Sequence, residues 1–104
     1  MRKAEVFLHG EKAGILEEVE KNRTCRFIYD AGYKGPGISL VMPAEAAVWK
    51  YDSFPPFFEG LLPEGFNLEA LLRNHKIDRD DNFSQLVAVG ADLPGAVTVF
   101  EIDP

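Results

Sequence analysis

The sequence has 104 residues, of which 46% are hydrophobic and 27% are charged, and its formal net charge is −6. A chain of this length forms one domain, and these proportions are typical of a globular protein and exclude a disordered one. The acidic balance disfavours a surface that binds nucleic acid. It leaves open whether the charge serves a basic partner or only solubility.

Cys25 is the one cysteine, so no disulfide can form within the chain, which is typical of cytosolic proteins. It lies in strand-like sequence and is interpreted as a small buried hydrophobe, not as a nucleophile. No apolar run approaches the roughly 20 residues of a membrane span, and Met1–Lys3 precede no signal-peptide core. We therefore expect a cytoplasmic protein, with a single domain over residues 1–104, that contacts no membrane.

The first third of the chain predicts strands joined by turns. Residues 4–8 fit a strand, with Ala4, Val6 and Leu8 on one face and Glu5 and Phe7 on the other, and residues 9–14 have the glycines of a turn. Residues 15–20 fit a helix or a strand by pattern alone, and their position favours the second strand of a hairpin. A turn at Asn22 leads into another strand at 25–29.

A glycine-rich loop is predicted at 30–37, before a short fourth strand at 38–42 that Pro43 ends. The loop lacks the Gly-Lys-Ser/Thr ending of a phosphate-binding loop, so a plain connector is favoured over a phosphate site. Residues 43–51 show no firm period, and one helical turn is compatible with residues 44–48.

The run from Ser53 to Phe66 contains three prolines and four phenylalanines. It is too apolar for an ordinary loop and too interrupted for one long helix or a central strand. We expect the rest of the domain, a partner, or both to cover it, with Trp49 and Tyr51 packing against it.

Two helices are predicted after this run. In the first, Asn67 is the expected N-cap, and four side chains at helical spacing share one face: Leu68, Leu71, Leu72 and His75. The second begins near Asn82, which forms a capping-box-like pair with Gln85, and it ends at Gly90 as a left-handed C-cap.

The last predicted strand covers residues 96–102 and has apolar residues on both faces, which favours a place inside the sheet. The sequence thus predicts an α+β fold: a small, mostly antiparallel β-sheet of about five strands, two short helices and a Pro-rich crossover.

Few residues suit catalysis. His9 and His75 lie far apart in the chain and show no metal-ligand spacing, and no serine stands in a nucleophile motif. Glu59 and Glu64 form a carboxylate pair, for which solvated or capping roles are commoner than acid–base chemistry. The sequence also lacks the motifs of phosphoryl transfer. We therefore predict a protein that is not an enzyme and that has no metal or cofactor.

The run Phe57–Gly65, which reads Phe-Phe-Glu-Gly-Leu-Leu-Pro-Glu-Gly, resembles a signature of the N-terminal subdomain of HipA-type toxin kinases. Residues 38–43 and 81–97 resemble flanking parts of the same subdomain in order and spacing, so the resemblance covers nearly the whole chain. It implies the fold of that subdomain.

In HipA the subdomain precedes a kinase core, whereas this sequence stops at Pro104. The resemblance therefore implies a free-standing antitoxin of the HipS type, as found in three-component HipBST toxin–antitoxin systems. Its implied partners are a HipT-like kinase toxin, which it would bind and inhibit, and a HipB-like DNA-binding protein in a ternary complex. The alternative is a structural N-terminal subdomain of a HipA-type kinase without inhibitory activity.

The predicted partner-binding residues all belong to the central run: Phe57, Phe58, Glu59, Leu61, Leu62, Pro63, Glu64 and Phe66. Phe66 allows two interpretations. It precedes the expected N-cap, so it could staple onto Leu71. It could equally point outwards as an aromatic anchor for a partner, since interfaces are enriched in such residues.

Overall fold

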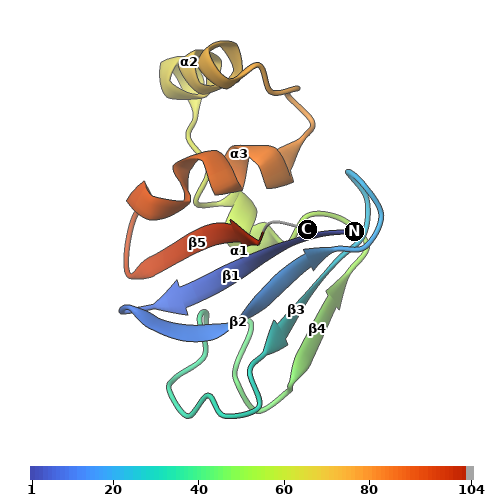
Figure 1. The fold of residues 1–104 in the computed structure, drawn as a ribbon, viewed down its shortest axis with the longest axis vertical. Coiled ribbons are helices and arrows are strands. Elements are labelled where there is room, and N and C mark those ends of the chain that lie inside the picture. Colours follow the sequence, from blue (N-terminus) through green and yellow to red (C-terminus); the bar gives the residue numbers. More distant parts are fainter. Residues whose placement is uncertain (103–104) are drawn as a thin grey trace.

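A five-stranded antiparallel sheet forms one layer of the structure, a computed structural model that describes residues 1–102 (Figure 1). The strands are β1 (Arg2–Leu8), β2 (Glu11–Glu18), β3 (Cys25–Tyr29), β4 (Val48–Tyr51) and β5 (Val97–Ile102). Their order across the sheet is β4-β3-β2-β1-β5. The helices are α1 (Pro56–Glu59), α2 (Gly65–His75), α3 (Asn82–Val89) and a 3-10 turn, η1 (Gly90–Asp92). This confirms the α+β fold.

Strand alternation builds the core. Ala4, Val6, Leu16 and Phe27 lie on one face of the sheet and are fully buried, because successive strand residues point to opposite faces. The helical side of this core is supplied by α1 and α3, whose fully buried side chains are Phe58, Phe83 and Leu86. The alternation predicted for β1, β3 and β5 is thus confirmed.

The fourth strand was placed wrongly by the sequence. Residues 38–42 form no strand of the sheet but a turn with a single bridge between Ser39 and Met42. The Tyr29 hydroxyl fixes this turn, since it donates to the Met42 carbonyl and accepts from the Ile38 amide. The strand that pairs with β3 is instead β4, a segment for which no strand was predicted.

Strand β5 lies at an edge of the sheet, so the prediction of a place inside the sheet was wrong. The apolar residues on its outer face are explained by a local contact. The Phe100 ring, 46% exposed, meets the Phe7 ring edge to face, with 5.8 Å between centroids. Such a pair shelters an exposed sheet face without a further strand.

The turns and helix ends also differ in detail. The first turn contains only His9 and Gly10, both at positive φ, and β2 starts at Glu11 instead of Ile15. Helix α2 starts at Gly65 with Glu64 as N-cap, so Asn67 lies inside the helix. Helix α1, within the Pro-rich run, was not predicted.

Helix α3 is capped by Asp81, whose carboxylate accepts from the Ser84 amide at 3.2 Å, so the Asn82–Gln85 capping pair was wrong. Gly90 is right-handed, with φ of −58°, and is not a left-handed cap. It is needed for another reason. A Cβ there would lie 1.8 Å from the Val99 carbonyl oxygen, so only glycine allows η1 to approach β5 this closely.

Candidate protein-interaction surface at α1 and α2

The central run divides into a buried part and an exposed part. Phe58 is fully buried, and its ring lies 6.0 Å from that of Phe27 and 6.5 Å from that of Phe54, centroid to centroid. Phe57 packs edge to face on Phe58 at 5.1 Å and is half-buried. Phe58 therefore belongs to the core and offers no side-chain surface to a partner. That removes one of the eight predicted binding residues from direct contact.

The segment that follows forms a partly exposed surface. Leu61, Leu62 and Pro63 are half-buried and line a groove beside α2 and α3, whereas Glu59 and Glu64 are exposed. These five residues thus lie along one short segment, from the last residue of α1 to the N-cap of α2. Whether they bind a partner stays a prediction.

Phe66 projects from the first turn of α2 and is 94% exposed. A hydrophobic staple requires the residue before the N-cap, and Phe66 follows the N-cap Glu64 instead. The staple onto Leu71 was therefore wrong, and Phe66 has an outward-facing side chain. Glu69 and Arg73 share this outer side of the helix, because they follow at spacings of three and seven.

Helix α2 stands at one end of the molecule, with α3 between it and the sheet (Figure 1). Only Leu71 of its eleven residues is buried. Residues at positive φ lie at both ends, Gly65 at +58° and Lys76 at +54°. A groove between α2 and α3, lined by both apolar and polar side chains, has a volume of about 470 Å³.

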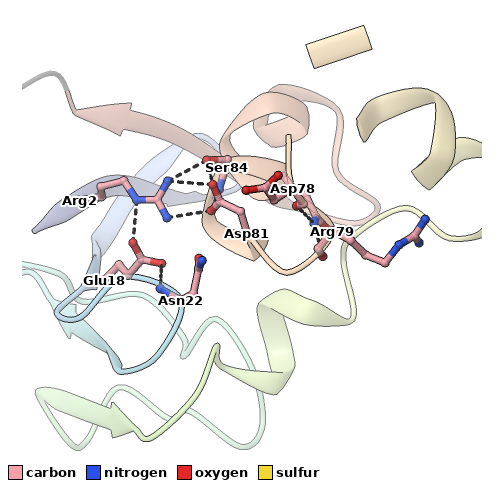
Figure 2. Close-up of polar contacts among 8 residues, drawn as sticks. Arg2, Glu18, Asn22, Asp78, Arg79, Asp81 and Ser84 are labelled. Carbon is pink, nitrogen blue, oxygen red and sulfur yellow. Dashed lines mark hydrogen bonds and ion pairs between the residues drawn. The ribbon is translucent and has the colours of Figure 1, made fainter. Parts of the chain in front are cut away.

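Helix α3, in contrast, is tied to the sheet by the Arg2 guanidinium (Figure 2). Arg2 Nε donates to Glu18 at 2.7 Å, Nη2 donates to Asp81 at 2.8 Å, and Nη1 donates to the Ser84 hydroxyl at 2.7 Å. The guanidinium carbon also lies 4.8 Å from the centroid of the Phe83 ring. This network joins β1, β2 and the N-terminus of α3.

The charges in this network reinforce one another. Burial alone would raise the pKa of Asp81, but hydrogen bonds from Arg2 and Ser84 outweigh it and hold that pKa below its usual value. Glu18 is almost fully buried and also accepts from the Asn22 amide at 3.0 Å. No local sequence pattern predicts this network, because Arg2 and Asp81 lie far apart in the chain.

Potentially reactive side chains within residues 1–102 are neither gathered into a metal site nor, at Cys25, open to solvent. Within residues 1–102, no group of three or more His, Cys, Asp or Glu side chains is placed to hold a metal ion. The Cys25 thiol is buried, and burial together with the nearby Glu18 charge raises its pKa to about 11, so it stays protonated at neutral pH. In the same described range, none of the helices has the length and apolarity to cross a membrane.

The comparisons with known proteins agree with this fold. The family model of the HipA N-terminal domain matches residues 4–100. A solved structure described as the N-terminal domain of HipA toxin superposes with a TM-score of 0.77 at 30% identity, over 99% of this chain and 94% of that one. The chain belongs to the HipA N-terminal domain family.

Two relatives show this module in proteins of different length. An uncharacterised protein of Haemophilus influenzae is 35% identical over 101 residues, which is 97% of this chain and 93% of that protein. The putative kinase Y4dM of Sinorhizobium fredii is 35% identical over 105 residues, which is 91% of this chain. The chain spans about a quarter of that kinase, since the match covers 25% of its length.

Proposed function

We propose that this domain is an antitoxin that binds and inhibits a HipT-like serine/threonine kinase toxin. It would act in a three-component toxin–antitoxin system, in which a HipB-like DNA-binding protein joins the same ternary complex. Membership of the HipA N-terminal domain family supports a protein-interaction role beside a kinase. The match to 93% of a small Haemophilus protein supports a role apart from a kinase core in the same chain.

The observation that carries the proposal is the exposure of Phe66. A phenylalanine that is 94% exposed on a helix loses the free energy of apolar burial, about 1.5–3 kcal/mol for a side chain of this size. Aromatic side chains that fill a partner's pocket are typical hot spots of interfaces. Phe66 thus has the geometry of an anchor, at the end of the run that resembles the family signature.

The inhibition follows from differential binding. The domain docks on the N-lobe of the kinase and presents the segment from Glu59 to Phe66 to it. A docked segment there biases a nucleotide-binding loop, or the arrangement of the lobes, towards an inactive state. Such a ligand shifts the kinase only by as much as it binds the inactive state more tightly than the active one.

The experiment is to titrate the protein into autophosphorylation assays of the HipT-like kinase from the same genome. We expect wild type to abolish the signal and Phe66→Ala to restore it. The matched control is Leu40→Ala, which removes another fully exposed apolar side chain. Leu40 belongs to the loop between β3 and β4, at the far end of the molecule from α2 (Figure 1).

A second candidate function is a structural subdomain that stabilises a HipA-type kinase without inhibiting it. The match to one quarter of a putative kinase favours this alternative. Binding of wild type with no fall in autophosphorylation would support it and contradict the antitoxin. Inhibition that survives Phe66→Ala would keep the antitoxin but reject the anchor.

A further inference from the structure

We propose that the groove between α2 and α3, which is lined in part by Leu61, Leu62 and Pro63 of the segment Glu59–Phe66, receives an apolar side chain from the same partner that Phe66 contacts. This inference rests on the proposed function, because it needs a partner seated on α2. It extends that function, because the partner would then contact α2 on two sides, at Phe66 and at the groove.

The groove has the shape and composition of a side-chain pocket. Its volume of about 470 Å³ exceeds that of any single side chain, and its apolar walls are Leu62 and Leu71 on one side and Val89 and Leu93 on the other. Ala88 of α3 also lines it, and that small side chain leaves the groove open. Leu71 and Leu93 are each close to fully buried, so the groove lies directly over the packed part of the domain.

The size of a stable interface argues that Phe66 does not act alone. One aromatic side chain buries roughly 150–250 Å², whereas a specific interface buries roughly 800 Å² on each partner. A partner seated on Phe66 must therefore contact further surface next to α2. Two surfaces adjoin the helix: its outer side and the groove.

Composition favours the groove over the outer side. The outer side has Glu69 and Arg73, and the cores of interfaces are depleted of charged residues. Glu69 is also engaged already, since it accepts from Arg79 Nη2 at 2.5 Å. Asp92 and His75 also line the groove, but it offers four large apolar side chains, Leu62, Leu71, Val89 and Leu93, which suit an inserted apolar side chain.

Two asparagines that line the groove indicate the chemistry of the partner segment around the inserted side chain. Asn67 and Asn74 are seven positions apart, so they lie on one side of α2, and both line the groove. Their amides are exposed and offer donors and acceptors to the backbone around an inserted side chain. The partner segment is therefore expected to be uncharged and apolar at its centre, with polar backbone at its edges.

Helix α2 makes few packing contacts with the rest of the domain, and a side chain inserted into the groove would add contacts. Isolated helices below about 12 residues are marginal in water, and α2 has eleven residues with one buried side chain. An inserted side chain would contact α2 on a different side from Phe66. Binding and ordering of α2 would then reinforce each other.

The test blocks the groove from each wall by adding an arginine. Ala88→Arg fills it from α3, and Asn74→Arg fills it from α2; both positions are exposed helical ones where arginine is compatible with folding. The matched control is Ala91→Arg, which adds the same charge at an exposed alanine that does not line the groove. Affinity for the HipT-like kinase is measured by titration calorimetry, with thermal melting to show that each variant is folded.

We expect Ala88→Arg and Asn74→Arg each to weaken binding at least about tenfold, with Ala91→Arg within about twofold of wild type. Both groove variants binding like wild type, while Phe66→Ala does not bind, would overturn the groove and leave the proposed function intact. Equal weakening by all three arginines would overturn it as well, because the effect would then be one of charge. Failure of wild type to bind the kinase would overturn both proposals.

Discussion

Helices α2 and α3 follow each other in the chain, but they differ in how many side chains they bury and in how their N-termini are capped. Helix α3 has eight residues, of which Phe83, Gln85 and Leu86 are buried, and its N-cap Asp81 is held by Arg2 and Ser84. Helix α2 is longer, with eleven residues, yet buries only Leu71 and has no side-chain cap. One helix builds the core and the other presents a surface.

This difference separates the residues that fold the domain from those available to a partner. Both helices arise from similar apolar spacing, so periodicity alone does not distinguish them. What distinguishes them is the placement of aromatic rings: Phe83 lies against Arg2 and the core, whereas Phe66 lies in solvent. The following predictions test this separation, from the largest expected effect to the smallest.

The largest effect is expected for Phe83→Ala. Phe83 is fully buried, so its loss removes apolar burial and leaves a cavity, which costs about 3–5 kcal/mol of unfolding free energy. Urea denaturation at 25 °C would show this as a lower midpoint at an unchanged slope. A loss below about 1 kcal/mol would contradict the assignment of α3 to the core.

Gly90→Ala is expected to destabilise the fold by about 1–3 kcal/mol, because the new methyl group would meet the Val99 carbonyl oxygen at 1.8 Å. The control is Gly60→Ala, where the nearest atoms to the added Cβ lie at 3.5 Å and φ is −64°. That substitution should be neutral within about 0.5 kcal/mol. Thermal melting of both variants would measure the difference, and similar melting temperatures would contradict the close approach of η1 to β5.

Asp81→Asn is expected to cost about 1–2 kcal/mol at neutral pH, because it weakens the helix cap and the ion pair with Arg2. The folded pKa of Asp81 lies below its unfolded value, so this stabilisation is present above the unfolded pKa, near pH 4. It is lost as pH falls through the folded pKa.

The difference between wild type and Asp81→Asn should therefore shrink when urea unfolding is repeated near pH 3. Asp52→Asn, at an exposed aspartate, is the control that should change neither value. A difference that stays constant with pH would show that the Asp81 charge does not contribute through Arg2.

The smallest effect on stability is expected for Phe66→Ala, within about 0.5 kcal/mol of wild type. Its side chain is 94% exposed, and alanine has the higher helix propensity, so the two small effects nearly cancel. Urea denaturation, run in parallel with the kinase assay, would show that the variant loses binding while its free energy of unfolding stays unchanged. A loss above about 1 kcal/mol would mean that Phe66 packs within the domain.

Local pattern in the sequence predicted the elements whose burial alternates. It found β1, β3 and β5 and the existence of α2 and α3, because each has enough residues to show a period. It missed β4, which has only four residues, and it took residues 38–42 as a strand because their apolar composition resembles one. Those residues instead form a turn, which is held by hydrogen bonds of the Tyr29 hydroxyl.

The candidate surface was predicted as eight residues of one segment, without a distinction between those that are buried and those that are exposed. The run 53–66 was expected to be covered by the rest of the domain, a partner or both, and pattern did not show that Phe58 faces the core while Phe66 faces solvent. That distinction depends on where α2 begins, and the sequence placed the N-cap at Asn67 instead of Glu64. The groove and the Arg2 network join residues distant in the chain, so no local pattern reveals them.

The register of β1 has a consequence for synthesis of the protein. Strand β1 lies between β2 and β5, with Lys3 paired to Glu17 on one side and to Ile102 on the other. On the ribosome, the hairpin of β1 and β2 can form early, but one edge of β1 stays unpaired until β5 has emerged. Non-local pairing of this kind slows folding and exposes an aggregation-prone edge in the meantime. The nascent chain thus spends most of its synthesis with one side of β1, a strand inside the finished sheet, unpaired.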